Sequence, residues 1–245
     1  VFTNSRYMAI PGGWHSWPAS MATSLLMSGD MGVGLILCGS VMGANYLWNG
    51  LKFYDRKGAI EMHGPSGNYW QSIFYEIGMP LFSPIDGISE FGSMRIASEL
   101  IRTNEVTYCM LTPNGSACRK CTKCFRREIL RTCIDTNFEA NWENFKTPQI
   151  KDFLDKRPLY FGHIYSYARN FTTMPKWILD NIKDVQEIKT QWPSKYYLPA
   201  KDLVAPKRAA IIEERIIQHF DIMDDDEVLE LKNWNQEKYN SKLQN

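Results

Sequence analysis

The chain has 245 residues, of which 44% are hydrophobic and 22% charged, so it is long enough for one large domain or two small ones with a sizeable core. Its net charge of +1 gives no global field that would argue for nucleic acid or an anionic membrane as a partner. The chain does not open on a basic region followed by an apolar run, and four glycines interrupt the uncharged stretch 31–48. We therefore expect neither a signal peptide nor a membrane span.

Helical and strand-like segments alternate in the first half of the chain. Short apolar runs between glycines or prolines are typical of buried parallel strands, and longer segments with capping residues are typical of helices. This alternation predicts an α/β fold with a doubly wound parallel sheet, whose ligand site lies in the loops after the strands, here 39–56 and 84–91. The expected elements are a helix at Trp17–Met27, a strand at Val33–Cys38, a helix at Ser66–Ile77, a strand at Leu81–Ser83 and a helix at Ser89–Glu99.

The second half of the chain is richer in lysine and poorer in glycine. Pro206–Phe220 is the clearest amphipathic helix, because apolar residues recur on one face at helical spacing. The acidic run Asp221–Glu227 lacks the alternating ligands and central glycine of a calcium loop, so we expect a solvated turn there, and the polar segment 233–245 is expected to fray. We therefore predict an α/β domain over residues 1–135 and a mostly helical extension over residues 136–245.

Four cysteines fall in the short segment 109–124 with the spacing C-x8-C-x2-C-x2-C. Structural zinc takes four tetrahedral ligands, and thiolates at such spacings suit it. The last cysteine leads into a predicted helix, whose N-terminal partial positive charge helps to keep a thiolate ionised. We predict a structural Zn²⁺ site with no open position for catalysis, and buried or disulfide-paired thiols are the alternative. The predicted ligands are Cys109, Cys118, Cys121 and Cys124.

Five basic residues surround these cysteines. They can offset the negative charge that four thiolates leave around one Zn²⁺, or they can face nucleic acid as in some zinc ribbons. Because the chain as a whole is close to neutral, the compensating role is preferred. The five residues are Arg119, Lys120, Lys123, Arg126 and Arg127.

The remaining chemistry-bearing residues do not establish catalysis. Cys38 and Cys133 are expected to be buried core thiols, and six cysteines in so long a chain favour a reducing, cytoplasmic compartment over a disulfide framework. His15 and His63 have no partner at a catalytic spacing. Neither a G-x-S-x-G nor a G-x-x-x-x-G-K-[ST] motif occurs in the sequence.

The cysteine spacing, its place after an α/β segment and the basic helix that follows resemble the 7-cyano-7-deazaguanine synthase family of PP-loop ATP pyrophosphatases. In that family the four-cysteine motif binds a structural zinc near the end of an HUP-like α/β domain. Shorter matches lie upstream, so that the resemblance covers about residues 1–135. Ile10–Gly13 resembles the family's Val-Pro-Gly-Arg-Asn segment, and Ile36–Ser40 resembles the strand that precedes its Gly-Val-Asn loop. Tyr54–Arg56 resembles the family's Tyr-Pro-Asp-Cys-Arg loop, and Ser83–Ile88 resembles its Pro-Leu-Ile-Asp segment.

The resemblance implies an activity, a cofactor and a site. The activity is ATP-dependent activation of a carboxylate on a 7-deazaguanine-like small molecule, followed by capture with ammonia or an amine, as in queuosine biosynthesis. ATP acts in this chemistry with Mg²⁺. Asp55 and Arg56 are expected to contact the base-like substrate, and the loop from Gly39 through Ser40 to Asn45 to line its pocket. A divergent relative from an anti-phage operon also suits this pattern.

One element of the family is missing from the sequence. The nucleotide loop Ser-Gly-Gly-x-Asp-Ser does not occur, so a segment before Val1, a second copy of the chain or a partner would have to supply it. Without such a loop, the expected protein is a non-catalytic, zinc-stabilised binding or assembly protein. A zinc-ribbon nucleic-acid binder is the third possibility, and it predicts steeply salt-dependent binding.

Overall fold

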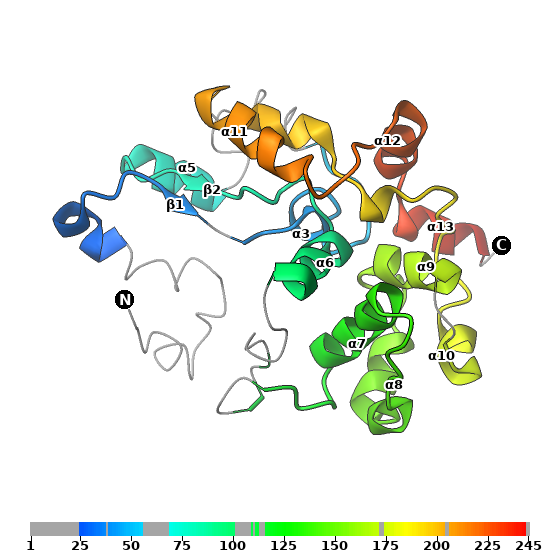
Figure 1. The fold of residues 1–245 in the computed structure, drawn as a ribbon. Helices are drawn as coiled ribbons and strands as arrows, with labels where there is room; N and C mark the ends of the chain where they lie inside the picture. Colours follow the sequence, from blue (N-terminus) through cyan, green and yellow to red (C-terminus); the bar gives the residue numbers. More distant parts are fainter. Residues whose placement is uncertain are drawn as a thin grey trace. The chain divides into compact units, whose positions relative to one another are not determined.

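The computed structural model describes residues 25–37, 39–55, 69–100, 109, 111–112, 116–171, 174–203 and 206–243 (Figure 1). The chain divides into two compact units, and each is described by itself. Unit 1 comprises Val1–Gly39 and Asp55–Pro84, and unit 2 comprises Ser40–Tyr54 and Ile85–Asn245. Several residues of the sequence analysis lie outside the described ranges, namely Ile10–Gly13, His15, Cys38, Arg56, His63, Ser66 and most of the helix expected at Trp17–Met27.

The described part of unit 1 contains one pair of short parallel strands, β1 (Ile36–Leu37) and β2 (Leu81–Phe82). Strands of a doubly wound sheet are covered on both faces, whereas in β1 Ile36 is buried and the Leu37 side chain is 62% exposed. The described chain is otherwise mostly helical. The predicted α/β fold with a doubly wound, HUP-like parallel sheet is therefore wrong. An apolar run between glycines indicates that a segment can be buried, but it does not indicate how many strands pair with it.

α5 (Tyr69–Glu76) precedes β2 and ends where the sequence predicts. Gly78 has a φ of +76°, the left-handed conformation that commonly terminates helices. The backbone N–H of Met79 then donates to the carbonyl of Phe74 at 2.9 Å. Ile36, Phe74 and Met79 form the small buried core of unit 1.

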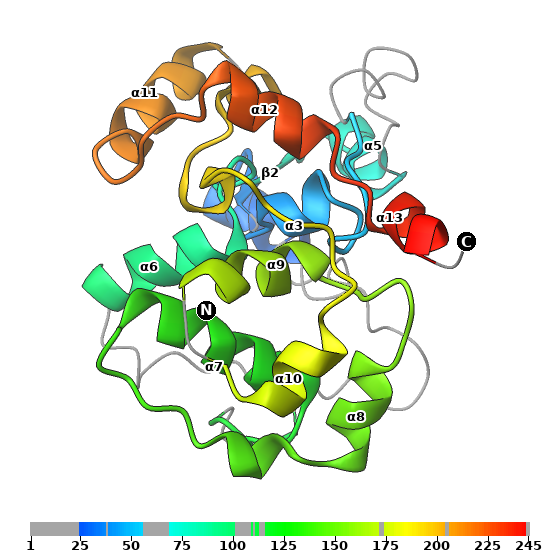
Figure 2. The same cartoon turned by 90° about the vertical axis from the view of Figure 1, so that its right-hand side faces the viewer.

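Unit 2 is built from helices around one main core (Figures 1 and 2). α7 packs against α6, α8 and α9. The large side chains Phe125 and Tyr165 fill the space between α7 and α9, and Trp192 and Trp234 are also fully buried. The helices are α3 (Met42–Asn45), α6 (Glu90–Leu100), α7 (Thr122–Ile134), α8 (Pro148–Leu154), α9 (Gly162–Phe171), α10 (Lys176–Asn181), α11 (Pro206–Ile216), α12 (Asp225–Lys232) and α13 (Gln236–Leu243), with 3-10 turns η3 (Trp142–Phe145), η4 (Trp192–Ser194) and η5 (Leu198–Leu203).

Capping residues set two helix starts in unit 2. Thr147 accepts the backbone N–H of Ile150 at 3.3 Å where α8 begins, and Pro148 occupies the first turn. Asp224 caps α12, and the Glu227 carboxylate accepts the backbone N–H of Asp224 at 3.0 Å, which completes a capping box. The acidic run that was expected to form a solvated turn therefore starts a helix.

α13 occupies the C-terminal segment that the sequence analysis expects to fray. The Gln236 side chain is fully buried, accepts the backbone N–H of Gln186 at 2.8 Å and donates to the carbonyl of Asp184 at 2.9 Å. The Gln236 backbone N–H also donates to the carbonyl of Leu51. The expected fraying is wrong for this helix, because a polar composition does not distinguish solvated side chains from buried ones whose hydrogen bonds are satisfied.

A tight turn after α3 places three consecutive residues at positive φ. The values are +41° for Trp48, +59° for Asn49 and +76° for Gly50. The left-handed conformation costs about 1–2 kcal/mol for a residue other than glycine. The backbone N–H of Phe161 donates to the Asn49 carbonyl at 2.8 Å, and the indole N–H of Trp234 donates to the Gly50 carbonyl at 3.0 Å. These bonds hold the strained turn against the main core.

Candidate metal centre

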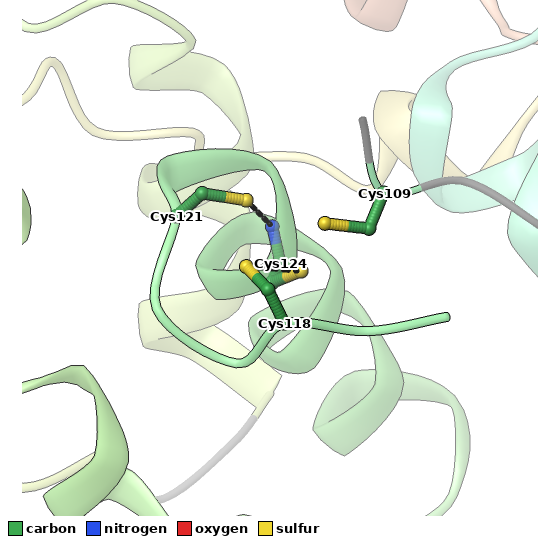
Figure 3. Close-up of side chains that lie close together, drawn as sticks. All are labelled: Cys109, Cys118, Cys121 and Cys124. Atoms are coloured by element: carbon green, nitrogen blue, oxygen red, sulfur yellow. Dashed lines mark hydrogen bonds between the residues drawn. The ribbon is translucent and has the colours of Figure 1, made fainter. Parts of the chain in front are cut away.

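The start of α7 brings three of the four cysteines together. Cys121 is the N-cap of α7, and its sulfur accepts the backbone N–H of Cys124 at 3.4 Å. One turn earlier the backbone N–H of Lys120 donates to the sulfur of Cys118 at 3.4 Å, and Arg119 has a left-handed φ of +55°. Both Cys-x2-Cys segments are therefore tight turns whose backbone N–H groups point at sulfur. Cys109 lies beside these turns but comes from an earlier segment of the chain (Figure 3).

The four sulfur atoms are close enough to share one ion. All lie within 4.8 Å of one another, and the Sγ atoms of Cys118 and Cys124 are 3.7 Å apart. A tetrahedral ion with metal–sulfur bonds of about 2.3 Å holds its sulfurs about 3.8 Å apart, so a contraction of about 1 Å at the widest pair completes the site. Cys109, Cys121 and Cys124 are buried and Cys118 is half-buried. The four cysteines can thus hold a metal ion, and their thiolates fill a tetrahedral coordination sphere.

Burial and backbone donors act on these thiols in opposite directions. Burial raises the pKa of Cys121 and of Cys124 above the usual thiol value. Burial also acts to raise the pKa of Cys109, but hydrogen bonds from the backbone of Leu111 and Cys118 outweigh it and lower this pKa to about 6. Because metal ions bind thiolates, an incoming ion must displace the protons of Cys121 and Cys124, whereas Cys109 is already ionised at neutral pH.

A second polar cluster lies at the end of α3 and contains two of the predicted substrate-binding residues. The Ser40 hydroxyl donates to Oδ1 of Asn45 at 3.3 Å, and the Asn45 amide donates to the carboxylate of Asp86. Asp86 is 4% exposed and comes from the Ser83–Ile88 segment, which the sequence analysis matched to a family motif without assigning a role to the carboxylate. The structure therefore brings Ser40 and Asn45 together. Of the other predicted residues, Gly39 and Asp55 belong to unit 1, and Arg56 lies outside the described residues.

Sequence reasoning missed a buried pair between α6 and α9. Nε2 of His163 lies 3.0 Å from Oε2 of Glu90, and the His163 side chain is 1% exposed. The imidazole stacks on Trp192, with ring centroids 6.1 Å apart, and its Nδ1 has no hydrogen-bond partner among the described residues. The two residues are 73 positions apart in the sequence, so no spacing rule could have indicated the pair.

Two glycines allow the close packing around this pair. A Cβ on Gly43 would lie 2.3 Å from Oε1 of Glu90, and a Cβ on Gly50 would lie 2.6 Å from Nδ1 of His163. Both distances are far below van der Waals contact. At Gly50 the added Cβ would also meet the Phe161 backbone, so only a glycine fits there, whereas at Gly43 the Glu90 carboxylate would have to shift. The backbone of the strained turn therefore closes directly over the unpartnered nitrogen.

Arg126 lies between the metal centre and the Glu90–His163 pair. It follows Cys124 by two residues on α7, and its guanidinium stacks over the Phe161 ring at 3.4 Å from the centroid. Burial lowers the pKa of Arg126 from its ordinary value, while the nearby Glu90 carboxylate acts in the opposite direction. Burial acts to raise the pKa of Glu90, but His163 and Arg126 outweigh it, so that the pKa of Glu90 is lowered. This half-buried arginine thus differs from Lys123 and Arg131, which are exposed on the same helix.

The fold and the cysteines define a largely helical protein with a four-cysteine centre that can hold a metal ion. The chain belongs to the family of unknown function DUF6395, whose family model matches residues 69–235. This match includes the four cysteines and the Glu90–His163 pair, and it begins after Ser40 and Asn45. No curated protein and no solved structure matches the chain. Within the part of the chain that the structure describes, no helix has both the length and the apolar character needed to cross a bilayer.

Proposed function

We propose that Cys109, Cys118, Cys121 and Cys124 bind one structural Zn²⁺. We also propose that unit 2 is a helical binding or assembly unit that this zinc ion stabilises. The observation that carries this proposal is the mutual approach of four sulfur atoms to within 4.8 Å. Four thiolates saturate tetrahedral zinc, so the ion has no open position for substrate or water. A site of four thiolates needs reduced cysteines, so the proposal includes a reducing, cytoplasmic location.

The ion would join the segment at Cys109 to the start of α7 within the main core. Cys109 and the start of α7 belong to that core, and Cys121 caps α7 through its own sulfur. When the metal is removed, the cysteine sulfur atoms are no longer coordinated to a common ion. Because zinc binding in such sites supplies folding free energy, chelation is expected to lower the stability of unit 2 by several kcal/mol.

Paired cysteine variants test this proposal. Cys124→Ser removes a ligand, whereas Cys133→Ser alters a half-buried thiol of the same helix whose Sγ–H donates to the carbonyl of Ile129 at 3.3 Å. We expect Cys124→Ser to lower the thermal midpoint and to make it insensitive to chelator. Cys133→Ser should keep the chelator-sensitive midpoint of the unaltered protein. Equal behaviour of the two variants would show that the cluster has no special role.

A second candidate is ATP-dependent activation of a carboxylate on a 7-deazaguanine-like molecule, with Mg²⁺. The hydrogen-bonded chain from Ser40 through Asn45 to Asp86 favours it, because these polar groups are fixed in a loop expected to line a substrate pocket. The strained turn at 48–50 follows directly, and such strain is often found at functional sites. A second copy of the chain or a partner segment would supply the nucleotide loop.

Product formation tests the second candidate. The full protein is incubated with ATP, Mg²⁺ and a carboxylated 7-deazaguanine, and AMP and pyrophosphate are measured. Asn45→Ala and Asp55→Ala should each reduce turnover, while Asn141→Ala, at an exposed position whose side chain caps nothing, should not. If turnover is unchanged in Asp55→Ala, Asp55 does not contact the substrate. If the unaltered protein forms no AMP that depends on the carboxylate, the second candidate is wrong and only the binding or assembly role remains.

A further inference from the structure

We propose that the two Cys-x2-Cys turns form a surface that binds the phosphate backbone of double-stranded nucleic acid. Three basic side chains of these turns, Arg119, Lys120 and Lys123, are exposed. None of the three forms an ion pair within 4.0 Å among the described residues, although the Glu128 carboxylate interacts electrostatically with Arg119. The inference rests on the proposed zinc site, because the same turns hold three of its ligands.

The local charge of this segment is strongly positive although the chain is nearly neutral. Residues 116–131 contain six basic residues and one acidic residue, Glu128. Four thiolates around one Zn²⁺ contribute two negative charges, which leaves the segment positive. At physiological ionic strength a charge acts over about 8 Å, so a ligand at this surface responds to the segment and not to the net charge of the whole chain. The balanced composition therefore does not exclude an anionic partner here.

The metal centre would hold these cations in place. The Lys120 backbone N–H is bonded to the Cys118 sulfur, and Arg119 is fixed at a positive φ between two ligands. Lys123 stands in the first turn of α7, between the ligands Cys121 and Cys124. Side chains that leave a rigid backbone lose less conformational entropy on binding than side chains on a flexible loop. A guanidinium also matches the geometry of a phosphate group with two parallel hydrogen bonds.

The neighbouring residues favour a duplex backbone over other anionic ligands. Single strands are usually held by aromatic side chains that stack on bases, and residues 116–123 contain no aromatic residue. Membrane surfaces are usually bound with apolar anchors beside the cations, and no large apolar side chain within residues 116–131, all of which are described, is exposed. A contact made only through phosphates would not depend on base sequence.

The test is binding of fluorescently labelled 20-base-pair DNA and RNA duplexes to the zinc-loaded protein at several salt concentrations. Three phosphate contacts predict a logarithmic salt slope of about −2.7, which is a loss of about 40-fold in affinity between 50 and 200 mM salt. Arg119→Ala/Lys120→Ala/Lys123→Ala should weaken binding at least tenfold and reduce the steepness of the slope by about 0.9 per side chain, that is about 2.7 in total. Binding of either duplex supports the proposal, and the comparison assigns the nucleic acid.

A matched triple variant is the control. Lys183→Ala/Lys232→Ala/Lys238→Ala removes the same charge from three exposed positions of unit 2 and should leave binding unchanged. Zinc content is measured for every variant. A protein without zinc contradicts the metal proposal, whereas an unaltered protein that contains zinc but does not bind duplex contradicts this inference alone. Equal losses in the two triple variants, salt-independent binding, or equally tight binding of polyglutamate or of phosphatidylserine vesicles would overturn the inference.

Discussion

Gly50 allows a direct test of the packing around the buried histidine. Gly50 has a φ of +76°, and a Cβ at this position would lie 2.5 Å from the Cα of Phe161 and 2.6 Å from Nδ1 of His163. The Phe161 backbone cannot move away easily, because its N–H is bonded to the Asn49 carbonyl. The substitution Gly50→Ala therefore forces either the turn or the imidazole to shift.

The expected cost of Gly50→Ala has two parts. A left-handed alanine costs about 1–2 kcal/mol, and overpacking of a close-packed interior adds about 1–3 kcal/mol. Gly78→Ala is the matched control, because Gly78 has the same φ of +76° but no atom within 4 Å of the added Cβ. Both substitutions restrict the unfolded chain by the same small amount. Gly50 belongs to unit 2 and Gly78 to unit 1, so the loss of each variant is taken from the unfolding transition of its own unit, and the difference between the two losses isolates the packing part.

Urea unfolding of zinc-saturated protein, followed by circular dichroism and by tryptophan fluorescence, measures both variants. We expect Gly50→Ala to lower the free energy of unfolding by about 1–3 kcal/mol more than Gly78→Ala does. Imidazole signals in NMR spectra should also shift in Gly50→Ala only. If both variants lose the same free energy, the backbone of the turn does not close over His163, and the account of this packing is wrong.

Three further predictions concern the C-terminal helix, the buried pair and the metal turn. Gln236→Ala should destabilise the protein by about 2–4 kcal/mol in urea unfolding, because the side chain loses two hydrogen bonds and leaves their backbone partners unpaired. Glu237→Ala breaks an exposed ion pair and should cost less than about 1 kcal/mol. Since the folded pKa of Glu90 is lowered, its stabilising contribution is present above the unfolded pKa and is lost as the pH falls through the folded pKa. The gap in unfolding free energy between the unaltered protein and Glu90→Gln should hence shrink as the pH falls below the unfolded pKa of 4.5, and a gap that widens there would reverse the sign of this argument. Arg119→Val should weaken zinc binding in a chelator competition by about 1–2 kcal/mol, because a β-branched residue resists a positive φ, and Arg119→Asn should be close to neutral.

Local signals in the sequence predicted local structure well. The cysteine spacing indicated four residues that the structure holds together, and the glycine after α5 marked the end of that helix. α6 (Glu90–Leu100) lies within one residue of the helix predicted at Ser89–Glu99, and α11 begins at Pro206 as predicted but ends at Ile216 instead of Phe220. The helix boundaries depend on residues within one or two turns of each other, and the four cysteines lie within one segment of 16 residues, so a sequence pattern can show both directly.

Long-range features could not be predicted in the same way. The parallel sheet was inferred from two apolar runs, but a run does not specify its neighbours, and the described strands pair only with each other. The Glu90–His163 pair joins residues far apart in the sequence, so it depends on how α6 and α9 pack. The buried Gln236 lies in the polar segment 233–245 that was expected to fray, because composition does not show where a side chain finds its hydrogen-bond partners.

The metal content of the protein tests the central claim most directly. Protein purified from its natural source or expressed without added metal is analysed by elemental mass spectrometry, and the native mass is measured in parallel. The account predicts one zinc ion per chain, released when the cysteines are modified by a mercurial reagent and absent from Cys109→Ser. Protein that contains no zinc, or that keeps its zinc in Cys109→Ser with unchanged affinity, would contradict it.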